Sequence, residues 1–198
     1  MTTIVIVDYH AGNLTSVAKA FRHLGASVEV TSDPKVIERA NKIALPGVGH
    51  FAATQFLRDH GLDQAIVNKI QQGTPFLGIC VGLQWLFEGS TEAPGIPGAG
   101  LLSGRCERFR TEHKVPHVGW NSLSPKPDSR LLNKVPDGSY VYFTHSYRAA
   151  PLSDTAAVTE YGEPFTAAVE RNNIMGVQFH PEKSAATGLT ILRNFLQW

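Results

Sequence analysis

The chain has 198 residues, of which 42% are hydrophobic and 18% are charged, and its formal net charge at pH 7 is +1. These fractions are typical of a globular protein, and residues 1–198 are enough to bury a substantial core, so we expect a single domain. The charge balance predicts no basic surface for nucleic acid, and no apolar run is long enough to span a membrane, so we expect neither as a partner.

Alternating strand and helix patterns fill the first half of the chain. Continuous β-branched and apolar runs predict strands buried on both faces, and apolar residues spaced three or four apart predict helices. The first run, Ile4 to Val7, is not preceded by the basic residues of a signal peptide. The predicted order is a strand over 4–7, a helix over 14–24, a strand over 28–30, a short helix from 33, a strand over 43–45, helices over 52–58 and 62–71, and a strand leading to residue 80. This order predicts an α/β fold with a central, mostly parallel sheet flanked by helices.

The second half of the chain has a different pattern. Residues 89–100 are rich in glycine and proline, which predicts a surface loop. Short strand-like segments separated by turns follow, and we expect an antiparallel β addition to the main sheet in residues 101–170. A strand over 174–179 and a helix over 187–196, with its apolar residues on one face, complete the predicted fold.

The segment Gly78-Ile79-Cys80-Val81-Gly82 follows an apolar strand and precedes a helix. It has the pattern of a nucleophile elbow, in which a sharp strand-to-helix turn exposes one side chain at the edge of the sheet. Glycines two residues before and two after Cys80 allow the neighbouring backbone to pass closely. The start of the helix favours a thiolate at this position. We therefore predict that Cys80 is a nucleophile.

A base and a carboxylate occur late in the chain, where a strand-like run ends at His180 and Glu182 lies two residues further on. Imidazole can take a proton from a thiol, and a carboxylate can fix the imidazole tautomer and stabilise its positive charge. A lone buried cysteine is usually a core residue and a His-Pro pair is usually a turn, but together, at two strand ends, they favour catalysis. We predict a catalytic triad of Cys80, His180 and Glu182.

The strand over 43–45 runs into a loop with two glycines, Gly47-Val48-Gly49. Alone it would be an ordinary turn. Beside an elbow, its backbone N–H groups can bind an oxyanion together with the N–H of the residue after the nucleophile. We predict an oxyanion hole formed by Val48, or its neighbour Gly49, and by Val81. One such donor typically lowers the barrier by about 3–4 kcal/mol.

The elbow, together with Gln178-Phe179-His180-Pro181-Glu182, resembles the class I (triad) glutamine amidotransferases. Further segments resemble one branch of that family, the glutaminase subunits of imidazole glycerol phosphate synthase. These segments are Asp8-Tyr9, Gly12-Asn13-Leu14, Pro46-Gly47-Val48-Gly49, Pro116 to Asn121, Phe143 to Tyr147 and Glu182-Lys183-Ser184. The resemblance extends from residue 4 to about 196, so we expect no fused synthase domain. The sequence departs from the family pattern at His10-Ala11, Val81 and Leu83, outside the triad.

The resemblance implies a reaction with L-glutamine and no cofactor or metal. Cys80 attacks the side-chain amide, His180 protonates the leaving ammonia, and water then hydrolyses the glutamyl thioester to glutamate. The residues whose family positions imply contacts with glutamine are Gly47, Gln84, His145, Ser146 and Tyr147.

The resemblance also implies a partner. In this family the ammonia passes to a (β/α)8-barrel cyclase subunit, which forms a heterodimer with the glutaminase. The cyclase makes imidazole glycerol phosphate and an aminoimidazole carboxamide ribotide in histidine biosynthesis. This chain has no glycine-rich phosphate loop, so we expect the nucleotide to bind to the partner. Aromatic residues are common at interfaces and equally common in cores. Our candidates for the docking face are Trp120, Asn121, Tyr142 and Lys183.

Three other functions fit parts of the pattern. A glutaminase of another synthase, such as anthranilate or pyridoxal phosphate synthase, would share the triad, but residues 117–121 and 143–147 argue against it. A cysteine hydrolase or peptidase would usually have its histidine much sooner after the cysteine. A non-catalytic regulatory homologue would usually have lost a triad residue, and all three are present.

The chain has two cysteines, Cys80 and Cys106. With Cys80 assigned to chemistry, a disulfide framework is not expected, and a reducing cytoplasm is the expected location. Cys106 is assigned no role beyond packing.

Overall fold

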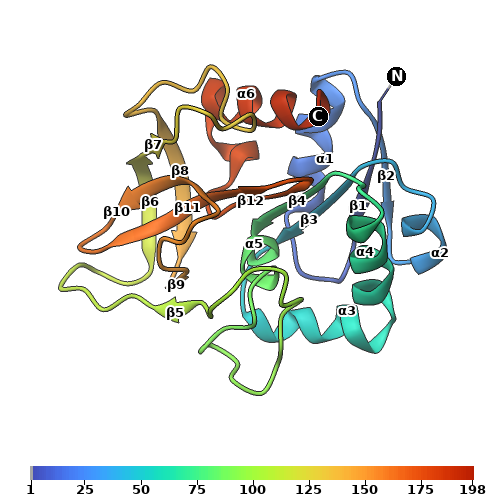
Figure 1. The fold of residues 1–198 in the computed structure, drawn as a ribbon, viewed down its shortest axis with the longest axis horizontal. Coiled ribbons are helices and arrows are strands. Elements are labelled where there is room, and N and C mark those ends of the chain that lie inside the picture. Colours follow the sequence, from blue (N-terminus) through green and yellow to red (C-terminus); the bar gives the residue numbers. More distant parts are fainter. Residues whose placement is uncertain (1) are drawn as a thin grey trace.

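The computed structural model describes residues 2–198. Its centre is an eight-stranded sheet with the strand order β2-β1-β3-β4-β12-β11-β10-β7 (Figure 1). The first five strands in that order run parallel, and each of the last three is antiparallel to the strand before it. The strands are β1 (Thr3–Val7), β2 (Ser27–Thr31), β3 (Ile43–Gly47), β4 (Phe76–Cys80), β7 (Ser124–Pro125), β10 (Thr155–Glu160), β11 (Pro164–Arg171) and β12 (Ile174–Val177). The predicted α/β fold with a mostly parallel sheet is confirmed.

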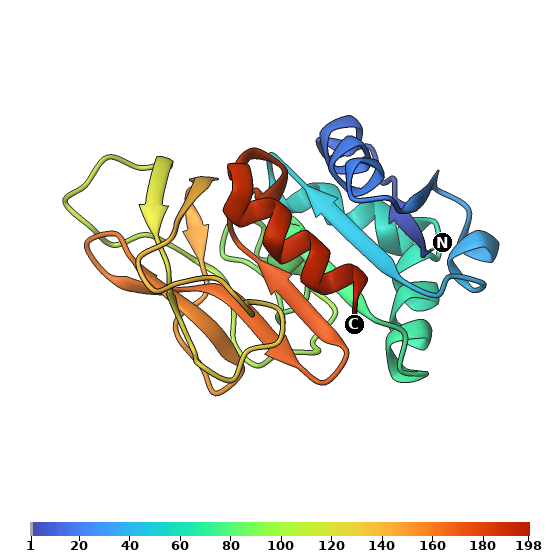
Figure 2. The same ribbon diagram turned by 90° about the horizontal axis from the view of Figure 1, so that it is seen from above.

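Helices cover both faces of the parallel part of the sheet (Figure 2). Ile4 and Ile6 of β1 face α1 and α6, whereas Val5 and Val7 face α2, α3 and α4 on the other side. Side chains alternate between the faces of a strand, so this one β-branched run contributes to both layers of the core. In residues 2–198, no helix has the length and apolar character needed to cross a membrane. The helices are α1 (Leu14–His23), α2 (Pro34–Ile37), α3 (Gln55–Asp59), α4 (Leu62–Gln71), α5 (Val81–Trp85) and α6 (Ala185–Leu196), with 3-10 turns η1 (Phe51–Thr54) and η2 (Pro181–Lys183).

The antiparallel region extends the main sheet only in part. β10 and β11 join it as expected, but four other strands form two separate ribbons, β5 (Glu107–Arg108) with β9 (Tyr147–Arg148) and β6 (His117–Ser122) with β8 (Tyr140–His145). Because β7 occupies the outer edge of β10, β6 and β8 pair only with each other.

Three neighbouring parallel strands, β3, β4 and β12, end at the same edge of the sheet. Gly47 at the end of β3 lies opposite Cys80 at the end of β4, and Val177 at the end of β12 lies opposite Ile79. Residues 47–49, the predicted oxyanion loop, therefore lie at the end of β3 on one side of Cys80, and the segment with His180 follows β12 on the other side. The carboxyl edge of a parallel sheet is where α/β proteins bind their ligands.

Candidate active site

Cys80 occupies a strained backbone position between β4 and α5. Its φ of +55° and ψ of −106° are unusual for a residue with a side chain. The flanking glycines are required by close packing. A Cβ on Gly78 would overlap the carbonyl oxygen of Gly82, and a Cβ on Gly82 would overlap that of Leu45 in β3. The predicted elbow geometry is thereby confirmed.

His180 and Glu182 are paired in the interior. The His180 Nδ1 atom lies 2.9 Å from Glu182 Oε1, and each side chain is 1% exposed. Burial alone would lower the pKa of His180, but the sulfur of Cys80 and the carboxylate of Glu182 together raise it to about 9. The other ring nitrogen, Nε2, is buried and makes no hydrogen bond to any residue that the structure describes. Nδ1 therefore faces the carboxylate, and Nε2 is the ring nitrogen without a hydrogen-bond partner among the described residues.

The segment that carries the histidine is fastened to β8. The His180 N–H donates to the carbonyl of Tyr142 (2.9 Å). The Ser184 hydroxyl donates to the carbonyl of His180 (2.6 Å) and accepts from the Tyr142 N–H (2.9 Å). A displacement of β8 at Tyr142 would therefore be transmitted directly to the main chain of His180.

The oxyanion loop lies beside the elbow. Gly47 is buried at the end of β3, where a Cβ would come within 2.7 Å of the Cβ of Val81. Val48 is partly buried, and Gly49 is exposed with a φ of +88°. The predicted donors Val48, Gly49 and Val81 are thus close to one another at the carboxyl edge, next to Cys80.

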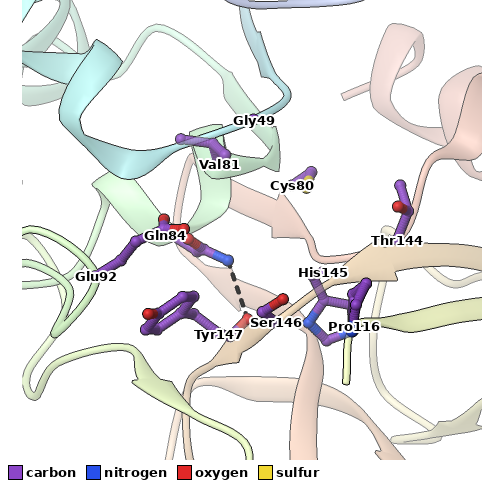
Figure 3. A pocket seen from close by; sticks show the side chains of 10 residues that line it. All are labelled: Gly49, Cys80, Val81, Gln84, Glu92, Pro116, Thr144, His145, Ser146 and Tyr147. Atoms are coloured by element: carbon purple, nitrogen blue, oxygen red, sulfur yellow. Dashed lines mark hydrogen bonds between the residues drawn. The ribbon is translucent and has the colours of Figure 1, made fainter. Parts of the chain in front are cut away.

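A cavity of about 200 Å³ opens over the sulfur of Cys80 (Figure 3). Six other predicted site residues line it: Gly49, Val81, Gln84, His145, Ser146 and Tyr147. The remaining lining residues are Glu92, Pro116 and Thr144, none of which was predicted as a site residue. Gly47 and Val48 do not line the cavity. The structure therefore brings most of the predicted glutamine-contact residues together around Cys80.

Glu92 adds a carboxylate to this cavity. It lies in the loop over 89–100, where glycine and proline predicted only a surface turn. Its Oε2 atom accepts a hydrogen bond from the N–H of Phe51 (2.8 Å), just beyond the oxyanion loop. A carboxylate at the wall of a small cavity is suited to pair with an ammonium group.

A chain of hydrogen bonds runs from β6 into the cavity. His145 Nδ1 donates to the carbonyl of Tyr147 (2.9 Å), which leaves His145 Nε2 to accept from His117 Nδ1 (3.1 Å). His117 Nε2 then accepts from Asn121 (3.4 Å). Burial lowers the pKa of His145 to about 3 and that of His117 to about 4, so both rings are neutral at pH 7. His145 Nδ1 therefore holds the Tyr147 carbonyl, and both ring nitrogens of His145 are occupied by hydrogen bonds.

Two glutamines continue the chain to the sulfur. Gln84 Nε2 donates to the carbonyl of Tyr147 (3.1 Å, dashed in Figure 3) and to Gln178 Oε1 (3.2 Å). The Gln178 amide donates to the sulfur of Cys80 at 3.6 Å. Gln178 was quoted in the family motif without a role. Its contact with Cys80 arises because β12 pairs with β4, which the sequence alone did not establish.

The four predicted docking residues are not all on one surface. Trp120 is 51% exposed and meets the ring of Tyr142 edge-on (6.1 Å between centroids), and Lys183 Nζ lies 5.8 Å from the centroid of Tyr142. Asn121 is separate from them, because it donates to the carbonyl of Glu160 (2.9 Å) and contacts His117. We call Trp120, Tyr142 and Lys183 the aromatic face.

Cys106 is fully buried in an apolar cluster, and burial raises the pKa of its thiol. This environment fits the packing role that the sequence indicated.

Glu182→Gln should lower the pKa of His180, because it removes one of the two groups that raise this pKa against the effect of burial. A raised pKa means that protonated His180 stabilises the fold below about pH 6.5, and this contribution is lost as the pH rises through about 9. NMR titration of the histidine ring measures the change. The exposed Glu38→Gln is the control and should leave the titration unaltered, and an unchanged His180 pKa in Glu182→Gln would contradict the assigned pairing.

Comparisons with known proteins identify the family to which this chain belongs. The sequence matches the family described as "Glutamine amidotransferase class-I" over residues 5–198. It is 49% identical over 195 residues to "Imidazole glycerol phosphate synthase subunit HisH" of Methanothermobacter thermautotrophicus, covering 98% of each chain. The protein of the same name from Nostoc punctiforme is 47% identical over 203 residues, covering 99% of this chain and 96% of that one.

A solved structure, "Crystal structure of glutamine amidotransferase", has a TM-score of 0.77 at 19% identity and covers 98% of this chain and 97% of its own; this likeness shows the shared fold. The family match across almost the whole sequence and the high identity to the two relatives show that this chain belongs to the class-I glutamine amidotransferases, in the HisH family of imidazole glycerol phosphate synthase subunits.

Proposed function

We propose that Cys80, His180 and Glu182 hydrolyse L-glutamine to glutamate and ammonia. The observation that carries this proposal is the elbow cysteine at the end of β4, with His180 held by Glu182 at 2.9 Å on the adjoining strand end. Cys80 and four of the five glutamine-contact candidates, Gln84, His145, Ser146 and Tyr147, share one small cavity. A cavity of that size suits a single amino acid better than a peptide.

The chemistry follows from the charge states. The raised pKa of His180 favours an imidazolium beside a thiolate at neutral pH. The Cys80 thiolate attacks the side-chain carbonyl carbon, and the N–H groups of Val48, or Gly49, and Val81 bind the resulting oxyanion. His180 Nε2 gives its proton to the leaving nitrogen, which departs as ammonia. The neutral imidazole then takes a proton from water, whose oxygen attacks the thioester and releases glutamate and the thiolate.

Several groups of the cavity hold the amino-acid end of the substrate. Glu92 pairs with the α-ammonium group of glutamine, and the backbone of residues 145–147, with Gln84, holds the rest of its amino-acid end. The hydrogen-bond chain from Asn121 to Cys80 supports this assignment, because it fixes the Tyr147 carbonyl from two sides. Gly47 acts indirectly, by placing the oxyanion loop.

The ammonia is passed to a (β/α)8-barrel cyclase subunit, with which this chain forms a heterodimer in the cytoplasm for histidine biosynthesis. The relatives' name, a subunit of imidazole glycerol phosphate synthase, supports this proposal. Residues 1–198 act as one domain, and the cyclase docks on the aromatic face. Because the Tyr142 carbonyl binds the His180 N–H, docking there can alter the triad.

Trp120→Ala should weaken the affinity for the cyclase by at least about tenfold, because it removes an exposed aromatic anchor from the aromatic face. Titration calorimetry measures the affinity, and circular dichroism checks that the variant is folded. Val30→Ala, which truncates an exposed apolar side chain on β2 at the opposite edge of the sheet, is the matched control and should bind normally. Unchanged affinity in Trp120→Ala would remove this residue from the docking face.

Ammonia release from glutamine tests the function as a whole. It is measured with this chain alone, with the cyclase, and with the cyclase and its nucleotide ligand. Low activity alone that rises strongly with the liganded partner is the expected result. Full activity that does not respond to the partner would contradict the coupling, and no activity in any mixture would contradict the glutaminase assignment.

A further inference from the structure

Tyr9 has a buried hydroxyl that nothing described so far uses. The residue follows β1 and is 1% exposed, packed among apolar residues of the layer that contains α2, α3 and α4. Its hydroxyl makes no hydrogen bond within residues 2–198. A buried tyrosine hydroxyl usually has a partner, and leaving one unpaired costs about 1–3 kcal/mol. An acceptor that becomes available at another stage of the reaction would satisfy this hydroxyl.

The hydroxyl lies against the oxyanion loop. A Cβ built on Gly47 would overlap the Tyr9 oxygen, and the same Cβ would lie 2.7 Å from Val81 Cβ and 3.2 Å from the Gly82 nitrogen. The α-carbon of Gly47 is therefore enclosed between the Tyr9 hydroxyl and the first turn of α5. Burial, and to a lesser degree Cys80, raises the pKa of Tyr9. The phenol thus stays protonated, and its O–H remains a donor throughout the reaction.

The sheet order gives this donor a direction. β3 lies between β1 and β4, so the end of β3 has Tyr9 on its β1 side and Cys80 on its β4 side. A trans peptide holds its C=O and N–H pointing in opposite directions. When the Val48 N–H points toward the oxyanion on the Cys80 side, the carbonyl of Gly47 must point away from Cys80, and Tyr9, whose hydroxyl adjoins the Gly47 α-carbon, follows the strand on that side.

We propose that Tyr9 is a positioning residue of the oxyanion loop, whose hydroxyl donates to the Gly47 carbonyl when the Gly47–Val48 peptide turns its N–H toward the oxyanion. This inference rests on the proposed glutaminase function. The bond is absent in the structure described here, so it stabilises the loop arrangement that binds the oxyanion and not the resting arrangement. An interaction gained only as the oxyanion forms raises kcat and leaves substrate binding unchanged.

Tyr9→Phe tests the inference, because it removes only the oxygen atom. In the presence of the cyclase and its nucleotide ligand, kcat should fall about tenfold, the value expected for one hydrogen bond. KM should stay the same, and Tm should stay the same or rise, because no bond is lost from the resting structure. A residue that only supported the fold would lower Tm without this selective loss of kcat.

Tyr161→Phe calibrates the stability measurement. Its hydroxyl donates to the carbonyl of Lys114 at 2.8 Å, so its loss should lower Tm. A Tyr9→Phe protein with wild-type kcat would overturn the inference, as would one whose Tm falls as far as that of Tyr161→Phe. If the wild-type protein releases ammonia and Tyr9→Phe has the same kcat, this inference fails and the glutaminase proposal stands. If wild-type protein releases no ammonia, the glutaminase proposal fails and the inference with it.

Discussion

Cys80→Ser should reduce ammonia release from glutamine by roughly 10⁴- to 10⁶-fold, the loss found when the nucleophile of a triad is removed. The hydroxyl is nearly isosteric with the thiol, so the cavity and the strained φ of +55° are kept. What is lost is the thiolate. A serine hydroxyl cannot form an ion pair with His180 at neutral pH, and without that pair the pKa of His180 falls toward its ordinary value.

Cys106→Ser is the matched control for this experiment. Cys106 is fully buried in an apolar cluster and does not line the cavity. Its substitution should cost stability, because it places a hydroxyl in an apolar cluster, and should leave the rate per folded molecule unchanged. If the Cys80→Ser protein still released ammonia in the presence of the cyclase, Cys80 would not be the nucleophile.

Gly82→Ala should destabilise the protein by about 3 kcal/mol or more and abolish activity in the remaining folded fraction. A Cβ at this position would overlap the carbonyl oxygen of Leu45 and lie 3.4 Å from its Cγ. Because the obstacle is the backbone of a central strand, α5 has to move away from β3. That movement displaces Cys80 and the Val81 N–H together.

The free energy of unfolding from urea titration measures the effect of Gly82→Ala. Gly95→Ala is the control, since Gly95 is exposed and an added Cβ meets no atom within 4 Å. It should change the free energy of unfolding by no more than about 0.5 kcal/mol. Equal stabilities for the two variants would contradict the close packing of α5 on β3.

The fold of the first half could be predicted because each element has a strong local pattern. The β-branched run in β1 and the helical spacing in α1 each indicate one structure, and strict alternation leaves few topologies. The antiparallel region was harder. β10 is a strand of small and polar residues, and the separation of the β6–β8 ribbon depends on which strand occupies the sheet edge. Tertiary contacts decide which strand occupies the edge of the sheet, and the local pattern of a short segment does not predict those contacts.

The same contrast applies to the site. The proposed triad could be read from the sequence because the elbow and the His-Pro-Glu segment each combine a reactive side chain with a strand end. Glu92, Gln178 and His117 were missed because each reaches the site by a contact across the fold: Glu92 to the N–H of Phe51, Gln178 to Cys80 and His117 to His145. Tyr9 was quoted only as part of a motif, and its relevance depends on β1 lying beside β3.

The most direct test of the central claim is a search for the glutamyl thioester on Cys80. Protein mixed with glutamine and the liganded cyclase is quenched in acid within the first turnover, and its peptides are weighed by mass spectrometry. The account predicts that the peptide containing Cys80 gains the mass of one γ-glutamyl group, and that this gain is absent in Cys80→Ser. Release of ammonia with no adduct at Cys80 at any time during the first turnover would contradict covalent catalysis by this residue.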